Sequence, residues 1–333
     1  MKTIKLIFLI ISTFSLASCE YDIEFNDKLP KDKLVVTSFI EADSVIYVKV
    51  SKSARPGTYN NYYDMFKSSS NIETSYVKNA LVSLYINGEL KETKNSALIN
   101  NKYSFNYIPN INDKVEIKVD YNGFDQVSGN AILNLYKPII DSTSIDIVID
   151  SSQEYFSKDL VLYIEIIDNG INDNYYQLDG LFIKTTTEGQ AQYEEKIDCS
   201  NFELIWENIV GVYNEEALSS TDSDSENKYK VFSNKRFKGK TYKAKFIIDR
   251  ETYYKKNLKA TSFVVSGNIF ASTIEKQVYQ YLYTLGKAYS GNDIGMGSEP
   301  VIIIDGLKNG YGFIGGRKTT KSNTINYSST KRK

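Results

Sequence analysis

The sequence predicts an all-β protein with two β-sandwich-like domains, the first immunoglobulin-like and the second carrying one packed α-helix near the C-terminus. Two observations lead to this fold class. Short runs rich in Val, Ile, Tyr and Phe recur along the chain, and turn-forming residues separate them, as is typical of strands. Only one segment, close to the C-terminus, spaces its apolar residues as an amphipathic helix does.

The first series of strand-like runs defines an N-terminal β-sandwich over residues 33–136. The run 115–119 alternates apolar and charged residues, the pattern of a strand with one buried face. Asn87-Gly88 and Asn122-Gly123 are dipeptides that favour tight hairpin turns. We expect strands at 34–40, 45–52, 81–87, 103–107, 115–121 and 127–133. Short strands spaced this closely along the chain favour an immunoglobulin-like sandwich.

Lys137-Pro138 marks the expected boundary of a C-terminal β domain, residues 137–320. Polar stretches at 60–78 and 218–228 are expected to be long loops, which in compact domains are usually functional or disordered. A disordered tail is expected over 321–333. The strands expected in the second domain are 139–149, 160–167, 175–187, 229–232, 242–248, 261–270 and 301–304.

One helix is predicted in the second domain, over residues 273–289. The segment Ser272-Thr273-Ile274-Glu275 has the sequence of a capping box, in which the first and last side chains satisfy free amides at a helix start. Apolar residues follow at helical spacing, and Ser290-Gly291 ends the pattern. We expect the apolar stripe to pack against a sheet.

The first 18 residues have the layout of a secretion signal. Lys2 and Lys5 precede an apolar run too short to span a bilayer, and small residues follow at Ala17 and Ser18. The sequence Leu16 to Cys19 resembles the bacterial lipobox, in which the peptide is cut before the Cys and the Cys is lipidated. We therefore predict a signal peptide over 1–18, a lipid anchor at Cys19 and a tether over 19–32, the alternative being an ordinary signal with a chance Cys.

The residues directly after Cys19 are acidic and apolar in alternation, from Glu20 to Glu24. This stretch resembles the surface-export signal of Bacteroidota lipoproteins, and a solvated tether is an equally good interpretation. The expected location is the outer membrane, to which the lipid holds the protein, and the export-signal interpretation places it at the cell surface.

Composition excludes several classes of site. The 333-residue chain contains no His, which removes Ser-His-Asp and Cys-His catalysis and zinc sites built on imidazole. The balance of 40 Lys and Arg against 41 Asp and Glu gives no argument for nucleic-acid binding, which needs a clustered basic face. With Cys19 lipidated, Cys199 has no disulfide partner and is interpreted as a small buried hydrophobe rather than a nucleophile. We predict no catalytic residue and no cofactor.

Two motifs have a functional and a structural interpretation. Residues 310–315 match the dinucleotide pattern G-x-G-x-x-G, but no helix pattern and no acid follow, so we expect a glycine-rich strand or turn close to another backbone and no nucleotide. Asp222, Asp224 and Glu226 alternate as calcium ligands do, although a solvated acidic loop is favoured because the usual Gly and distal Glu are missing.

The segment 168–174 is also rich in side-chain oxygens, which makes calcium a weak hypothesis there. Asp, Asn and Gly also cap chain reversals, and turn chemistry alone accounts for the composition of this segment.

Several segments together resemble an outer-membrane lipoprotein family of the Bacteroidota, domain of unknown function 4249. They are the lipobox, 33–36, 80–84, Asp173-Asn174-Tyr175-Tyr176, the helix with Tyr279, Tyr281 and Leu282, and 309–316. Such proteins are often encoded beside TonB-dependent receptors, so the resemblance implies an accessory lipoprotein of such a transporter. It brings no catalytic or ligand-binding residues.

Three functions remain open at this point. The first is a non-enzymatic lipoprotein that binds or caps a TonB-dependent transporter or presents a ligand to it. The second is a surface hydrolase of glycans or peptides that works through carboxylates, of which no pair is singled out. The third is an adhesive or structural surface protein, for which the 27 Tyr residues would provide binding area.

Overall fold

The computed structural model describes residues 32–53, 76–97, 99–150, 155–188, 191–197, 203–205, 229–254, 262–290 and 304–329. Within these ranges the protein is built from strands in several sheets and from a single α-helix, which confirms the predicted all-β class. Several predictions fall outside the described residues. They concern Cys19 as the predicted lipidation site, the expected signal and tether, residues 60–75 of the expected loop 60–78, Cys199, and the expected acidic loop with Asp222, Asp224 and Glu226.

The first sandwich has the strands that the sequence predicts and one more. Leu34–Ile40 was expected with these bounds, and its buried residues alternate strictly. The additional strand, β4, is polar and exposed, so it has no hydrophobic signal, and its pairing to β3 brings it into the sheet. The strands are β1 (Leu34–Ile40), β2 (Tyr47–Lys52), β3 (Leu81–Ile86), β4 (Glu89–Lys94), β5 (Lys102–Ser104), β6 (Lys114–Asp120) and β7 (Val127–Ile132), with a 3-10 turn, η2 (Ile99–Asn101), before β5.

The Asn87-Gly88 turn is where the sequence places it, whereas Asn122-Gly123 lies within a longer connection between β6 and β7. Asn87 and Gly88 join β3 to β4 with φ of 54° and 86°, left-handed values that an Asn-Gly turn provides. The order β4-β3-β6-β7 forms one sheet, and β5-β2-β1 belongs to the sheet that faces it. Alternate residues of both sheets form one apolar core, which includes Val36, Val82 and Ile117.

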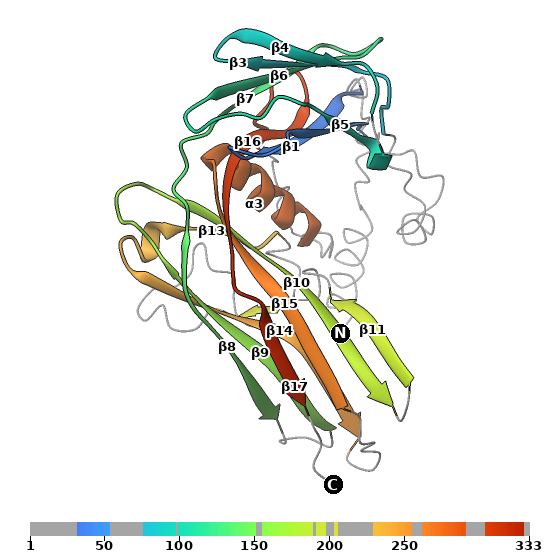
Figure 1. Ribbon diagram of the computed structural model, residues 1–333. Helices are drawn as coiled ribbons and strands as arrows, with labels where there is room; N and C mark the ends of the chain where they lie inside the picture. Colours follow the sequence, from blue (N-terminus) through green and yellow to red (C-terminus); the bar gives the residue numbers. More distant parts are fainter. Residues whose placement is uncertain are drawn as a thin grey trace, which may run out of the picture. The chain divides into compact units, whose positions relative to one another are not determined.

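The glycine-rich segment is a strand, β16 (Tyr311–Lys321), and both sandwiches share it. Its first half pairs parallel with β1, and its second half pairs antiparallel with β15 (Ser262–Ile274). Figure 1 shows β16 leaving β1 and continuing beside β15. Gly312 has φ 107°, and a Cβ there would lie 2.2 Å from the Val36 carbonyl oxygen, so the strand interpretation of the glycine motif is confirmed.

The second sandwich is formed by two sheets of longer strands. One sheet has the order β12-β14-β9-β8, and in the other β11, β10, β15 and β16 are neighbours, with β13 paired to β10 and β17 to β15. The strands are β8 (Ile139–Asp150), β9 (Tyr155–Ile167), β10 (Tyr175–Glu188), β11 (Ala191–Ile197), β12 (Glu203–Ile205), β13 (Val231–Ser233), β14 (Thr241–Tyr254) and β17 (Ile325–Ser329), and η4 (Asn234–Arg236) follows β13.

Strand β17 corrects the prediction of a disordered tail from residue 321. It pairs antiparallel with β15 from Gly267 to Phe263, and Ile325 is buried in the core of the second sandwich. The tail sequence is polar and has no strand signal of its own; pairing with a long neighbouring strand orders it.

The helix α3 spans Lys276–Ser290, so it begins three residues later than predicted, and the capping-box interpretation is wrong. Ser272 and Thr273 belong to β15, whose pairing with β10 continues to Ile274. The Thr273 hydroxyl donates to the Tyr136 carbonyl, and Ser272 shares a hydrogen bond with Thr319. Sheet pairing therefore overrides the local helix-start sequence.

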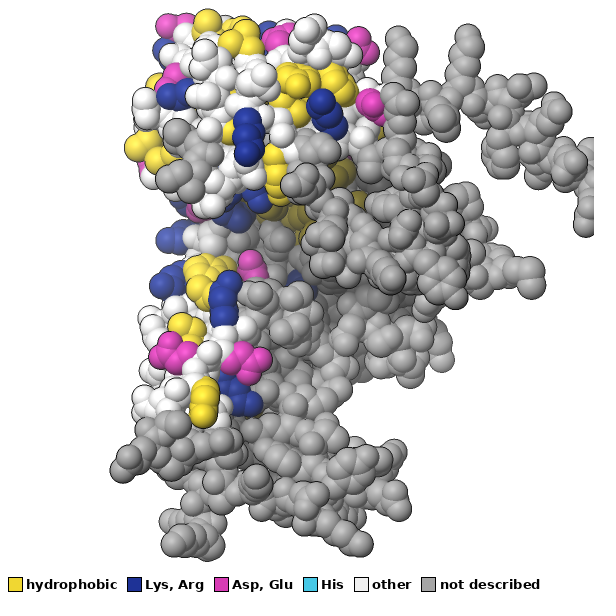
Figure 2. All heavy atoms as spheres, turned by 90° about the vertical axis from the view of Figure 1, so that its right-hand side faces the viewer, with side chains coloured by type: hydrophobic (Ala, Val, Ile, Leu, Met, Phe, Trp, Pro, Cys, Tyr) yellow, Lys and Arg dark blue, Asp and Glu magenta, His cyan; other side chains and the backbone are white. Residues whose placement is uncertain are grey.

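The apolar stripe of α3 packs as expected. Val278, Tyr281 and Leu282 form a small core with Ile274 and Phe313, at the strand that both sandwiches share. A Cβ on Gly315 would lie 2.0 Å from a Val278 methyl carbon, so the glycine permits the close approach of helix and strand. On the face drawn in Figure 2, Lys and Arg side chains lie beside hydrophobic side chains in the upper part of the view.

Candidate functional site

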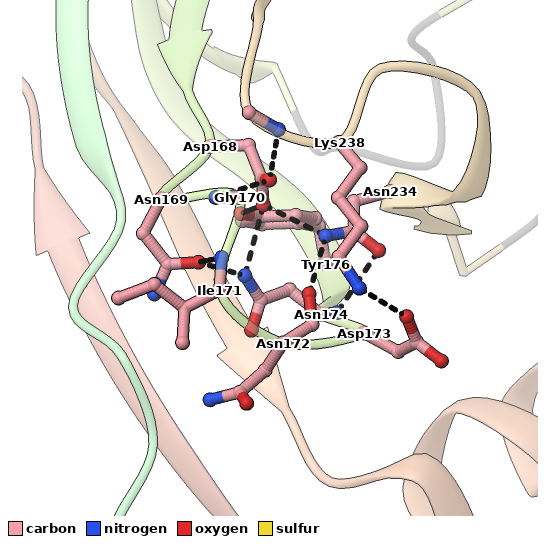
Figure 3. A network of polar contacts seen from close by, with 11 residues as sticks. Asp168, Asn169, Gly170, Ile171, Asn172, Asp173, Asn174, Tyr176, Asn234 and Lys238 are labelled. Carbon is pink, nitrogen blue, oxygen red and sulfur yellow. Dashed lines mark hydrogen bonds and ion pairs between the residues drawn. The ribbon is translucent and has the colours of Figure 1, made fainter.

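The most highly connected polar group among the described residues is the Asp168 carboxylate, just after β9 (Figure 3). Its Oδ1 accepts hydrogen bonds from Asn174 Nδ2 at 2.8 Å, the Tyr176 hydroxyl at 2.6 Å and Asn234 Nδ2 at 3.0 Å. Its Oδ2 accepts from the backbone N–H groups of Gly170 and Gly239, at 2.9 and 2.7 Å. We call Asp168, Asn174, Tyr176 and Asn234 the Asp168 network.

The electrostatics of the Asp168 network favour a charged carboxylate. Burial raises the pKa of Asp168, but hydrogen bonds from Asn174, Tyr176 and the Gly239 and Gly170 amides outweigh it, so the pKa is lowered overall. Burial and the neighbouring carboxylate together raise the pKa of Tyr176 far above its usual value. Asp168 is therefore ionised and Tyr176 is a neutral donor at neutral pH.

Asn234 extends the network to a segment 60 residues away in sequence. Its Oδ1 accepts from the Asn174 N–H, and its Nδ2 also donates to the Asn172 carbonyl. Lys238 forms an ion pair with Asp173 at 2.8 Å. The turn after β9 and the turn before β14 are thus fixed to each other at one end of the second sandwich.

This geometry assigns the segment 168–174 to turn formation. The Gly170 N–H donates to Asp168 and the Ile171 N–H donates to Asn169, the local side-chain-to-backbone bonds that Asp and Asn make in turns. The five donors already occupy a carboxylate that offers about four lone-pair sites. A calcium ion would have to displace those donors, so turn chemistry explains the composition that suggested calcium.

A second polar cluster lies between β15 and α3. Glu275 Oε1 accepts from the Ile132 N–H at 3.1 Å, and Oε2 accepts from the Gly316 N–H at 2.6 Å. Gln277 Nε2 donates to the carbonyls of Asn130 and Ile314, at 2.7 and 2.9 Å. The Glu275 and Gln277 side chains therefore connect β7 of the first sandwich to the shared strand β16.

We expect Glu275→Ala to lower the free energy of unfolding by about 1–3 kcal/mol, because the Ile132 and Gly316 N–H groups both lose their acceptor. Burial raises the pKa of Glu275 despite these bonds. Folding therefore takes up protons there, and the wild-type protein gains stability relative to the variant as pH falls from the folded-state pKa toward the unfolded value. Urea unfolding at several pH values measures both effects.

The matched control is Glu116→Ala, because Glu116 lies on β6, is partly exposed and, among the described residues, pairs only with Lys118, at 3.4 Å. A change within about 0.5 kcal/mol is expected there. Equal losses for the two variants would contradict a special role for Glu275.

Exposed aliphatic side chains mark a third feature, at the end of the first sandwich where β1 ends. Val45, Ile108 and Ile111 are 40%, 50% and 58% exposed. They lie in two loops that are joined by a hydrogen bond from the Asp43 N–H to the Pro109 carbonyl, at 2.9 Å. We call Val45, Ile108 and Ile111 the aliphatic loop patch.

Sequence reasoning found part of these sites. It singled out the turn 168–174 and Glu275, but assigned Glu275 to a helix cap, and it missed Asn234 and Gln277. Neither residue has a local signal, since each acts through partners that are distant in sequence. Among the described residues no group of three or more Asp, Glu, Cys or His side chains could hold a metal ion.

Comparison with known proteins identifies a family for this chain. None of the curated proteins searched matches the chain. In the part of the chain that the structure describes, no helix has the length and apolar character to cross a membrane. The model of one family, described as a domain of unknown function (DUF4249), matches residues 19–323. The chain therefore belongs to the family of domain of unknown function 4249.

Proposed function

We propose that this protein is a lipid-anchored outer-membrane accessory protein that binds or caps a TonB-dependent transporter or presents a ligand to it. The observation that carries the proposal is the position of Cys19. The segment that matches the family begins at this residue, and the secretion-signal sequence lies before it. Such an arrangement suits a mature chain that starts with a lipidated Cys.

The structured part of the chain supports a binding role. The shared strand β16 and the Glu275 and Gln277 hydrogen bonds join the two sandwiches, which favours a preformed scaffold. Such a scaffold presents loops with little entropy lost on binding. The aliphatic loop patch is the surface we assign to the transporter, because solvent-exposed aliphatic groups gain free energy when a partner covers them.

The direct test is purification of the tagged protein from gently solubilised native membranes, followed by mass spectrometry. A TonB-dependent barrel in stoichiometric amount supports the proposal. Recovery of the protein alone would contradict it and would favour the hydrolase or the adhesin, which screens of glycans, peptides and host matrix can then separate.

We expect the double variant Ile108→Ser, Ile111→Ser to lower recovery of the barrel at least about tenfold, since each buried aliphatic side chain contributes about 1.5–3 kcal/mol. Leu90→Ser, Leu81→Ser is the matched control, because these residues of β4 and β3 are similarly exposed and lie outside the patch. Quantitative mass spectrometry of the barrel measures the effect. Equal losses for both pairs would remove the patch as the binding surface.

A further inference from the structure

Two lysines at the end of the first sandwich where β1 begins lie over aromatic rings. The Lys33 ammonium is 4.7 Å from the centroid of the Tyr311 ring. The Lys52 ammonium is 5.1 Å from the Tyr121 ring and 5.6 Å from the Phe124 ring. We call these five residues the lysine–aromatic end.

Strand pairing brings these residues together from four parts of the chain. In the register of the sheet, the residue after Lys33 pairs with Lys52, and the next pairs with Tyr311. Tyr121 and Phe124 belong to the β6–β7 hairpin, and the Asn309 side chain fixes that hairpin by donating to the Gln126 carbonyl at 3.1 Å. The pairing of the strands therefore fixes the positions of the residues at the lysine–aromatic end.

The two lysines differ from Lys118 and Lys243, which also lie over tyrosines. Lys118 lies over Tyr85 and pairs with Glu116, and Lys243 lies over Tyr163 and pairs with Glu165. Lys102 over Tyr47, at 5.5 Å, also has no ion pair among the described residues, but it stands alone and not beside a second lysine over a ring. Among the described residues, no carboxylate lies within ion-pair distance of the ammonium groups at the lysine–aromatic end.

Acidic residues near this end have hydrogen-bond partners of their own. Asp120 accepts from the Gln126 side chain, and Asp305 accepts from the Gly312 N–H. Asp305 also interacts with the Lys33 charge, but from beyond ion-pair distance. Asp125 is exposed in the hairpin, and the exposed Lys308 pairs through its backbone with the start of β7. The ammonium groups of Lys33 and Lys52 therefore keep capacity for an external anion.

We propose that the lysine–aromatic end lies against the phosphate-bearing headgroups of the bilayer that holds the lipid anchor, an inference that rests on the proposed anchoring at Cys19. The chain from Cys19 enters the body at Lys33, and residues 19–32 can span at most about 50 Å. Tyr rings with a polar tip and Lys side chains with an apolar stem are suited to the headgroup layer. Lysines near an anionic surface add electrostatic attraction.

The test uses the full mature chain from Cys19, coupled through the Cys19 thiol to maleimide lipid in phosphatidylglycerol vesicles. Cys199→Ser leaves one thiol, and Trp206→Phe removes the single Trp. A Trp is then introduced either as Asn122→Trp, in the hairpin of the lysine–aromatic end, or as Ser44→Trp, in the β1–β2 loop at the other end; both positions are exposed. Lipids with a nitroxide headgroup quench a Trp that touches the headgroups.

We expect strong quenching of the Trp at position 122 and little at position 44. Lys33→Gln with Lys52→Gln should lower the ratio of docked to undocked protein about fivefold for each lysine. Lys118→Gln with Lys243→Gln should leave it unchanged, because those lysines have carboxylate partners.

Equal quenching at both positions, or equal losses for both lysine pairs, would overturn the inference. Because the coupling is chemical, this result is independent of whether cells lipidate Cys19. Failure of the anchor and failure of the docking surface are thus distinguishable.

Discussion

Cys19→Ser is expected to release the protein from the membrane. Without the thiol no diacyl group can be attached, and each buried methylene of an acyl chain contributes about 0.8 kcal/mol to membrane binding. The loss of two or three chains should therefore lower the membrane-bound fraction at least about tenfold. Fractionation of cells, followed by mass measurement of the mature N-terminal peptide, provides the readout.

Cys199→Ser is the matched control, because it removes the only other cysteine and leaves the lipobox intact. This variant should remain in the membrane fraction with its acylated N-terminal peptide. If the Cys19 variant stayed in the membrane as well, the anchor would have to be elsewhere, and the accessory-lipoprotein proposal would lose its main support.

Asp168→Asn is expected to destabilise the second sandwich by about 2–5 kcal/mol. The amide nitrogen of Asn would face either the Gly170 and Gly239 N–H groups or the three side-chain donors, so buried donors lose their acceptor. Each unsatisfied buried group costs about 1–3 kcal/mol. Urea unfolding followed by circular dichroism measures the change in the free energy of unfolding.

Asp173→Asn is the control in the same turn, since Asp173 is exposed and pairs with Lys238. Its effect should stay within about 0.5 kcal/mol. Comparable losses for Asp168 and Asp173 variants would show that the Asp168 network does not contribute beyond a surface ion pair.

The effect of Asp168→Asn should also depend on pH. The folded-state pKa of Asp168 lies below its unfolded value of about 4, so its stabilisation is complete above that pH. The stabilisation is lost as pH falls from about 4 through the lower folded-state pKa, and the difference between wild type and variant shrinks in that range.

The local patterns that the sequence predicts correctly are those that depend on one strand at a time. Alternation placed β1 and β6, and Asn87-Gly88 placed a hairpin turn, because side chains alternate across a strand and Asn-Gly adopts left-handed φ readily. The glycine motif was interpreted as a strand for the right reason, close backbone packing.

The patterns that failed depend on partners distant in sequence. Ser272 and Glu275 have the spacing of a helix cap, but β15 continues past Ser272 because β10 and β16 both pair with it. Strand β4 is polar and has no apolar face, and β17 lies in a segment whose sequence predicts a disordered tail. Both segments form strands because they pair with neighbouring strands.

The sequence by itself determined the all-β class, the positions of most strands in the first sandwich, and the turn chemistry around Asp168. These follow from side-chain alternation and local backbone preference, which need no distant partner. Three features were decided only by the tertiary structure. One strand joins both sandwiches, Asp168 accepts a hydrogen bond from Asn234, and Lys33 and Lys52 lie over aromatic rings at one end of the first sandwich. Sheet order and loop closure bring those groups together, and neither is encoded in a local pattern.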